Sequence, residues 1–241
     1  MTELTRRERS RRDTTDEIKQ AAWAEVQETG PSALSLRSVA RRVNLTPSAI
    51  YRYFDSRDAL LTALIIDAYS AVAEELESRY RRSRGSARTV FLKVALAYRR
   101  WALDHRVEYE LIFGTSIPGY TGTEQTTLAA MRSTNVLLQI LADLLAEGGF
   151  DHETWQSRLT PELRGRLQGW ADEMAEPLPP EALLAALSCY ANLHGAINVQ
   201  MHSLLPPMLD RNEDLFVATI NRSLDDLQLA PAHHSRSMSP G

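Results

Sequence analysis

Four side chains that can bind nucleic acid occur within six consecutive residues: Ser48, Tyr51, Arg52 and Tyr53. A hydroxyl, a guanidinium and two phenols can hydrogen-bond to phosphate oxygens and to base edges in the major groove of DNA. A surface helix seldom exposes two tyrosines and an arginine within one turn unless a partner covers them. The segment therefore predicts a binding surface whose chemistry matches DNA.

Such a surface requires a helix that buries its opposite side. At 3.6 residues per turn, Ile50 and Phe54 lie on one face, while Ser48 and Arg52 point in nearly the opposite direction. The flanks of this helix carry Ala49, Tyr51 and Tyr53. The alternative interpretation is a plain three-helix core element, which leaves a polar and aromatic face without a partner.

The residues around this helix are typical of a helix-turn-helix. Ser35 can cap a first helix over residues 36–43, and Thr46 can cap the second helix, which opens with Pro47 and ends near Phe54. Between them lies the three-residue turn 44–46, whose first residue is an asparagine and so tolerates a left-handed backbone. Two short helices across a tight turn are the layout of a helix-turn-helix.

The apolar pattern of the remaining chain has helical period almost throughout, which predicts an all-α protein. A helix over residues 15–29 precedes the helix-turn-helix. A long helix over residues 57–82 follows it and joins it to a helical body, with an apolar stripe on one face. That stripe consists of Leu60, Leu64, Ala68, Val72 and Leu76. Further helices are predicted around residues 91–101, 107–113, 123–147, 181–205 and 212–227, with short helices and loops over 150–180.

These patterns divide the chain into four parts. Residues 1–14 are predicted to be a disordered basic arm and residues 15–57 a DNA-binding domain. Residues 58–229 are predicted to be a helical domain, for which the family resemblance described below implies effector binding and dimerisation. The Ser- and Pro-rich residues 230–241 are predicted to be a disordered tail.

Charge and composition favour the same interpretation. The 241 residues have a formal net charge of −4, yet residues 1–57 hold 11 basic and 8 acidic side chains. A basic head on an acidic body favours a polyanion partner at the head. The single cysteine, Cys189, excludes an internal disulfide and fits a reducing cytoplasm. The apolar stretches are shorter than the ~18 residues of a membrane helix, and no signal peptide is evident, so no membrane partner is expected.

A specific set of residues links the first helix to the start of the long helix. The set is Ile18, Ala21, Ala22, Gly30, Ser35, Val39, Ala40, Val43, Leu45, Ser48, Ile50, Tyr51, Tyr53, Phe54, Arg57 and Leu60. With these residues the chain resembles the TetR/AcrR family of transcriptional regulators. It departs from the usual pattern at Asn44, where the family has Gly, and at Arg57, where the family has Lys.

The resemblance implies which residues touch DNA. Ser48, Ala49 and Arg52 would lie nearest the groove, while Tyr51 and Tyr53 would touch the backbone or base methyls. Phosphate would be held at the starts of the second and fourth helices. The implied DNA-binding set is Ser35, Arg37, Thr46, Ser48, Ala49, Tyr51, Arg52, Tyr53 and Arg57. The arginines of the arm would reach an adjacent minor groove, or alternatively form a solvated tail; they are Arg6, Arg7, Arg9, Arg11 and Arg12.

The body carries a second, less specific resemblance. Residues 109–120, the tripeptide 193–195 (Leu-His-Gly) and residues 214–216 are similar to TetR-type regulators with a so-called WHG C-terminal domain. The Trp expected before the tripeptide is missing, and Tyr190 is the nearest aromatic residue. This resemblance implies a helical body that binds an effector and forms a homodimer. Helices 181–205 and 212–228 are the expected dimer contacts, since pairing them across a two-fold axis gives a four-helix bundle.

Aromatic and amide side chains of the body are candidates for lining an effector pocket. The predicted set is Tyr98, Trp101, Tyr109, Phe113, Met131, Asn135, His194 and Asn198. Most such residues at helical spacing simply belong to a core, which is the alternative for each one. The asparagines are more informative, because a buried amide needs partners.

Two segments match catalytic motifs only in part. Gly114 and Gly119 have the spacing of P-loop glycines, but no Lys-Ser/Thr pair follows them. Residues 114–118 nearly match a nucleophile elbow, but a proline replaces the last glycine and no strand precedes them. His194 and His202 are eight residues apart, which is not a metal-ligand spacing. The sequence therefore predicts no enzyme, no metal and no cofactor, and an α-helical enzyme is the disfavoured alternative.

The predicted function is a ligand-responsive transcriptional regulator in the cytoplasm. In its simplest form it is a repressor that binds a palindromic double-stranded DNA operator as a homodimer. A small molecule, apolar or aromatic, would act as effector and release the DNA. The alternative within the same fold is an activator or a regulator that responds to no effector.

Overall fold

The computed structural model describes residues 5–148, 150–174 and 177–227, and no strand occurs in these ranges. The all-α class is therefore confirmed. Residues 230–241, which we predicted to be a disordered tail, lie outside the described residues. The chain divides into two compact units, each considered by itself. Unit 1 comprises Met1–Glu77 and Trp101–Thr134, and unit 2 comprises Ser78–Arg100 and Asn135–Gly241.

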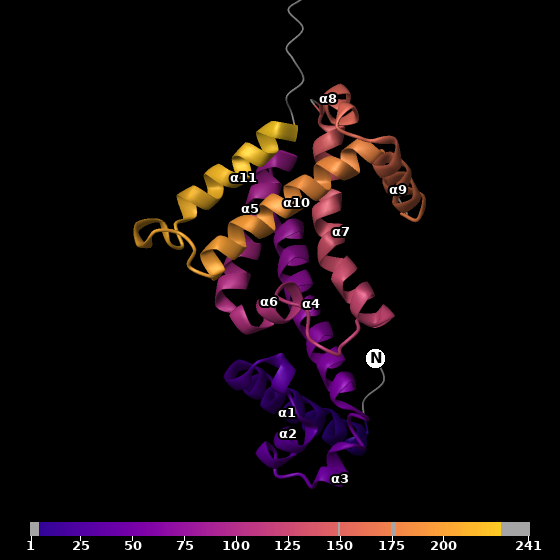
Figure 1. Ribbon diagram of the computed structural model, residues 1–241, viewed down its shortest axis with the longest axis vertical. Helices are drawn as coiled ribbons and strands as arrows, with labels where there is room; N and C mark the ends of the chain where they lie inside the picture. Colours follow the sequence, from indigo (N-terminus) through magenta and orange to yellow (C-terminus); the bar gives the residue numbers. More distant parts are fainter. Residues whose placement is uncertain (1–4, 149, 175–176, 228–241) are drawn as a thin grey trace, which may run out of the picture. The chain divides into compact units, whose positions relative to one another are not determined.

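Unit 1 contains the predicted helix-turn-helix. Its first elements are α1 (Arg6–Thr29), η1 (Pro31–Ala33), α2 (Leu36–Arg42) and α3 (Pro47–Ile50), which lie together in Figure 1. They close around one apolar core, whose most buried members are Ile18, Ala22, Val39, Ala40, Ile50, Leu60, Leu61 and Leu64. These core positions come from α1, α2, α3 and the first turns of α4 (Arg57–Arg82), so the small domain depends on the long helix to complete it.

The long helix α4 spans Arg57–Arg82, as predicted, and all five residues of its predicted stripe are buried. It is followed by α5 (Ala87–Asp104), α6 (Arg106–Phe113) and α7 (Glu124–Ala146). The boundary between the units falls within α4, α5 and α7. The compact units thus do not coincide with the predicted domains 15–57 and 58–229. Those domains were divided by role, and this division remains a prediction.

Unit 2 is built around α10 (Pro180–Met201). This helix packs against α8 (His152–Ser157), α9 (Pro161–Asp172) and α11 (Glu213–Leu227), and Figure 1 shows α10 and α11 side by side. Helix α10 starts one residue before the predicted range, at Pro180. Its end is earlier than predicted, because the chain turns at Ser203 with a φ of 50° and continues into η2 (Pro207–Leu209).

Two predictions about the head of the chain are wrong. We expected residues 1–14 to be disordered, but residues 6–14 form the first turns of α1. Thr5 and Glu8 make a capping box there, with the Thr5 amide donating to Glu8 Oε2 at 2.8 Å. We also expected the second helix of the motif to reach Phe54, but α3 ends at Ile50 and residues 51–53 form a turn.

Helices α7 and α10 are long and apolar enough to cross a membrane, by length and composition alone. The sequence pattern did not indicate this, because the apolar positions are interrupted by polar ones and form no unbroken run. Core helices of water-soluble proteins share both properties. Within unit 2, α10 packs against three other helices.

Candidate nucleic-acid interface

The turn between α2 and α3 is fixed by local backbone chemistry. Asn44 has a φ of 54°, the left-handed conformation predicted for it. The Leu45 amide donates to the carbonyl of Ala40 at 2.9 Å, which closes the end of α2. Thr46 caps α3 by accepting from the Ala49 amide at 3.2 Å, and Pro47 occupies the first helical position. These contacts set the direction in which α3 leaves the turn.

The two sides of α3 and its following turn differ sharply. Ile50 is fully buried and Phe54 is 8% exposed. Ser48 and Arg52 are exposed, and Tyr51 keeps 46% of its surface in solvent. This is the orientation predicted from helical angle, and it holds although the α-helix stops at Ile50. The amides of residues 52 and 53 still donate to carbonyls three residues earlier, so the turn continues the helical path.

The other two predicted groups on this segment are partly buried. Ala49 and Tyr53 both have intermediate exposure, and Tyr53 packs against the apolar core of unit 1. The guanidinium of Arg11 lies over the Tyr53 ring, 5.7 Å from its centroid. Arg11 also donates to the backbone carbonyl of Arg52 at 3.1 Å. The start of α1 is thus attached to the turn that presents Tyr51 and Arg52.

Ser35 and Arg37 stand at the start of α2. Arg37 is exposed, and no hydrogen bond or ion pair of its side chain occurs in the described ranges. The side chain of Ser35 makes no capping bond, and its backbone amide instead donates to Glu25 Oε1 at 3.0 Å. Glu25 is only 3% exposed, so a buried carboxylate of α1 holds the first turn of α2.

A second contact between α1 and α2 was missed by the sequence reasoning. Arg42, at the end of α2, donates to both carboxylate oxygens of Glu28 and lies 3.6 Å from the carboxylate of Glu25. The hydrogen bond to Arg42 lowers the pKa of Glu28, and the same bond raises the pKa of Arg42. These residues are 14 to 17 positions apart, so no local spacing could have linked them.

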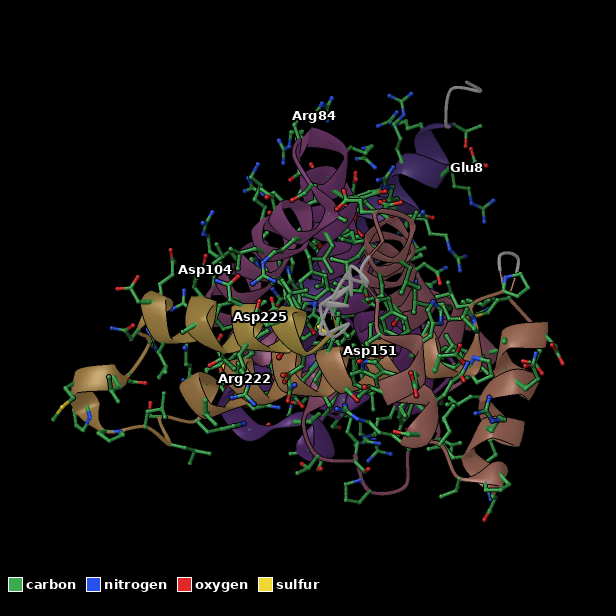
Figure 2. The ribbon with its side chains drawn as sticks, turned by 90° about the horizontal axis from the view of Figure 1, so that it is seen from above. Glu8, Arg84, Asp104, Asp151, Arg222 and Asp225 are labelled. Carbon is green, nitrogen blue, oxygen red and sulfur yellow. The ribbon has the colours of Figure 1, made fainter. Side chains whose placement is uncertain are left out.

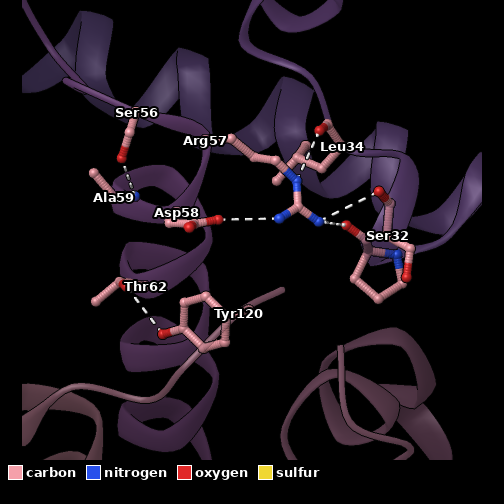
Figure 3. A network of polar contacts seen from close by, with 9 residues as sticks. Ser32, Leu34, Ser56, Arg57, Asp58, Ala59, Thr62 and Tyr120 are labelled. Carbon is pink, nitrogen blue, oxygen red and sulfur yellow. Dashed lines mark hydrogen bonds and ion pairs between the residues drawn. The ribbon is translucent and has the colours of Figure 1, made fainter. Parts of the chain in front are cut away.

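Arg57, which the resemblance assigned to phosphate, lies within a network of its own unit (Figure 3). Its Nε donates to the carbonyl of Leu34 at 3.1 Å, and one terminal nitrogen donates to the carbonyls of Pro31 and Ser32 at 3.0 and 3.3 Å. The other terminal nitrogen pairs with Asp58 at 3.0 Å. The start of α4 therefore holds the segment that leads into α2.

The eight predicted pocket residues fall into two groups, because they belong to different units. Unit 1 holds Trp101, Tyr109, Phe113 and Met131. Tyr109 and Phe113 pack with ring centroids 5.1 Å apart, and Trp101 stacks on the ring of His105 at 5.3 Å. Met131 is 46% exposed. The three aromatic residues thus have aromatic neighbours within their unit.

Unit 2 holds the other four, namely Tyr98, Asn135, His194 and Asn198. The Tyr98 hydroxyl lies 3.2 Å from Nε2 of His194, and the ring of Tyr190 lies 4.2 Å from the histidine ring. Burial lowers the pKa of His194 to about 4, so the ring is neutral at pH 7. Asn135 is exposed, so it is not the buried amide that we expected.

Protein-family comparisons match both parts of the chain. A family model described as bacterial regulatory proteins of the tetR family matches residues 18–64, which include the helix-turn-helix. A second model, described as the tetracyclin repressor-like C-terminal domain, matches residues 91–223 and so covers more than half of the chain. The first match contains all nine predicted DNA-contacting residues. Six lie in α3, its cap and its following turn, two at the start of α2 and one at the start of α4.

Individual proteins show the same likeness. The HTH-type transcriptional regulators Rv1816 of Mycobacterium tuberculosis and Mb1846 of Mycobacterium bovis are each 35% identical to this chain over 121 residues. These alignments cover 49% of this chain and 52% of each relative, so the chain spans about half the length of the curated relatives it matches.

Solved structures extend the likeness over most of the chain. The protein SCO4313, designated a regulatory protein, is 34% identical with a TM-score of 0.75, covering 92% of this chain and 100% of its own. A protein of unknown function from Rhodococcus sp. RHA1 is 23% identical with a TM-score of 0.67, covering 89% and 95%. The second likeness concerns the fold alone.

Proposed function

This chain belongs to the TetR family of bacterial regulatory proteins, and from that membership we propose that it is a cytoplasmic transcriptional repressor. It binds a palindromic operator in double-stranded DNA as a homodimer, and a small molecule releases it. The family's helix-turn-helix domain spans residues 18–64 of the chain. The proposal is a regulator and not an enzyme.

One observation carries the DNA-binding part of the proposal. Ser48 and Arg52 stand in solvent on the side of the α3 segment opposite the buried Ile50 and Phe54. Tyr51 is exposed on the flank beside them. A major groove admits a helix whose exposed side chains reach base edges, and arginine and hydroxyl groups supply the donors that such readout uses. The Arg37 side chain at the start of α2 is available for a phosphate of the same DNA.

The dimer part of the proposal is supported by a groove on α10 and α11. This groove has a volume of about 380 Å³ and is lined by small and apolar residues, among them Ala191, Gly195, Val199, Leu215 and Phe216. A Cβ added at Gly195 would meet no atom within 4 Å, so the helix backbone is open to a close neighbour there. A second copy of the same two helices fits this surface, because a two-fold axis pairs them into a four-helix bundle.

Charged residues follow the groove residues of α11 along the same helix, where Figure 2 labels Arg222 and Asp225. Arg88 binds Asp225 at 2.8 Å, and Arg222 binds Asp226 at 3.5 Å. A polar rim around an apolar centre is typical of protein interfaces. It supports the same assignment of the groove to a second copy.

The effector part of the proposal is supported by the cluster of Tyr98, Tyr190 and His194. The ring centroids of Tyr98 and Tyr190 lie 5.4 and 4.2 Å from that of His194, which is neutral at pH 7 because burial lowers its pKa. Aromatic walls with a few polar groups suit a small apolar or aromatic molecule. Such a ligand releases DNA only if it binds the free and the DNA-bound states with different affinity, typically by ~1–3 kcal/mol.

The test of DNA binding starts with a random duplex library from which the full-length protein selects its preferred sequence. We expect an imperfect palindrome with half-sites about one helical turn apart, roughly 34–36 Å. Tyr51→Ala and Arg52→Ala should weaken binding to the selected duplex, each by about 10-fold or more, since a good base contact contributes ~1–3 kcal/mol.

The matched control is Arg41→Ala, another exposed arginine of the same domain that lies on α2. It should leave the preference for the selected duplex unchanged. Equal binding by all three variants would contradict the assignment of the α3 segment as the recognition surface. A selection that returns no common sequence would contradict DNA recognition itself.

A further inference from the structure

A cleft lies between the start of α1 and the turn that follows α3, both within unit 1. It has a volume of about 560 Å³ and is lined by Arg6, Arg7, Ser10, Arg11, Arg52 and Tyr53. Four of the six lining residues are arginines. The helix-turn-helix contributes two of the lining residues, so the cleft borders the surface that presents Tyr51.

The four arginines of the cleft have no carboxylate partner within residues 5–148, 150–174 and 177–227. Glu8, on the first turn of α1 (Figure 2), accepts hydrogen bonds from both the amide and the hydroxyl of Thr5. By contrast, Arg12 on the other side of α1 pairs with Asp16 at 4.0 Å. Like charges held together without a counterion repel each other, and an anion in the cleft relieves that repulsion.

The cleft is preformed and does not depend on a ligand for its shape. The capping box at Thr5 fixes the first turn of α1, and Arg11 donates to the carbonyl of Arg52 at 3.1 Å while its guanidinium covers Tyr53. Guanidinium groups bind phosphate oxygens in a bidentate way, and the hydroxyls of Ser10 and Tyr53 can add neutral hydrogen bonds.

We propose that this cleft binds the phosphodiester backbone of DNA beside the bases that the α3 segment reads. This inference rests on the proposed function, because the DNA held by the recognition surface supplies the phosphates. The basic start of α1 thus acts as an ordered clamp on backbone phosphates next to the recognised sequence, and not as an arm that reads bases in the minor groove. Its contribution is to affinity and register, not to sequence preference.

The experiment compares two double variants of the full chain that remove the same charge from the same helix. Arg6→Ala with Arg7→Ala removes two arginines of the cleft. Arg9→Ala with Arg12→Ala removes two from the opposite side of α1. Alanine preserves the helix, so circular dichroism should be unchanged in both. Binding is measured against salt concentration on two probes, the selected duplex and a random-sequence duplex of equal length.

We expect the cleft variant to lower the slope of log K against log salt by about 1.8 for each bound copy, since each phosphate contact contributes about 0.9. This loss should be the same on both probes, and the control variant should retain the wild-type slope. Removing the base pairs that flank the palindrome should weaken binding by the wild type. The same removal should change the affinity of the cleft variant little.

Three results would overturn the inference, and they separate it from the proposed function. Equal slopes for the two double variants, with the preference for the selected duplex intact, would show that the cleft holds no phosphate. The affinity of the wild type could change when A·T pairs replace G·C pairs in the flanks of the palindrome. If only the cleft variant loses this change, these arginines belong to the minor groove. If the wild type binds neither duplex at low salt, both proposals are wrong. If the salt slopes are as expected but the selected duplex is not preferred, only the proposed function is wrong.

Discussion

The carboxylate of Glu25 on α1 accepts a hydrogen bond from the backbone amide of Ser35, with 3.0 Å between Oε1 and N. The first amides of a helix have no partner within the helix, and Ser35 supplies none from its own side chain. Glu25 therefore serves as the cap of α2 from another helix. Because α2 leads directly into the turn at Asn44, this contact also sets where the recognition segment begins.

Glu25→Ala should lower the free energy of unfolding by about 2–3 kcal/mol, because it leaves a partly buried amide without an acceptor. Glu25→Gln should lose less, since its side-chain oxygen still accepts from that amide. Urea unfolding followed by circular dichroism measures both. Glu28→Ala is the control: it removes an exposed partner of Arg42, and solvent screens exposed ion pairs, so its loss should be clearly smaller than that of Glu25→Ala. Equal losses for Glu25→Ala and Glu28→Ala would contradict the capping role.

Arg57→Ala should destabilise the DNA-binding domain even when no DNA is present. The variant loses the donors to three backbone carbonyls of residues 31–34, which we expect to cost about 2 kcal/mol. Thermal unfolding without DNA measures this loss, and Arg41→Ala is the exposed control. If Arg57→Ala unfolds like the wild type and is impaired only in DNA binding, the arginine acts on phosphate and its carbonyl contacts are unimportant.

His194 predicts a specific loss of stability in acid. Burial lowers its pKa to about 4, whereas the unfolded chain takes up the proton near pH 6.5. Below pH 6.5 the unfolded state binds more protons than the folded state, so stability is complete above that pH and falls as the pH drops toward 4. The full loss below pH 4 is about 3 kcal/mol.

The measurement is the difference in unfolding free energy between the wild type and His194→Gln across this pH range. This difference should change with pH, because the variant lacks the titrating ring while other groups titrate equally in both proteins. A difference that is constant from pH 7 to pH 4 would contradict the assignment of a neutral, buried His194.

Ala191→Glu should convert the proposed dimer into a monomer. Ala191 lines the groove of α10 and α11 and is exposed, so a glutamate there is tolerated by the single chain. In the dimer it would bury a charge without a partner, at a cost of several kcal/mol. Light scattering after gel filtration measures the mass. The control is Ala218→Glu, at an exposed position of α11 that does not line the groove, and it should leave the dimer intact. If Ala191→Glu is dimeric as well, the groove is not the dimer interface.

Sequence patterns were most reliable where structure depends on neighbouring residues. The bounds of α4, the left-handed Asn44 and the cap at Thr46 all follow from rules that act within a few positions. The start of α1 obeys the same kind of rule, since Thr5 and Glu8 have capping-box spacing. The many arginines beside that signal favoured disorder, and the prediction was wrong because the capping bonds and the contact of Arg11 with Arg52 outweigh the repulsion.

Contacts between distant positions could not be predicted in this way. The bond from Ser35 to Glu25, the pairing of Arg42 with Glu28 and the carbonyl contacts of Arg57 join residues 10 to 26 positions apart. Each depends on how two helices pack, which no single periodicity specifies. The predicted pocket illustrates the same limit, because helical spacing cannot separate the exposed Asn135 and Met131 from buried neighbours on the same helix.

The exposure of Tyr51, Arg52 and Ser48 has a consequence for how such a protein changes over time. Their side chains stand outside the packed interior, which Ile50 and Phe54 maintain without them. Substitutions at these three positions can therefore alter the preferred binding sequence while the scaffold keeps its stability. The same separation makes them the natural positions to randomise when the chain is to be redirected to a new target.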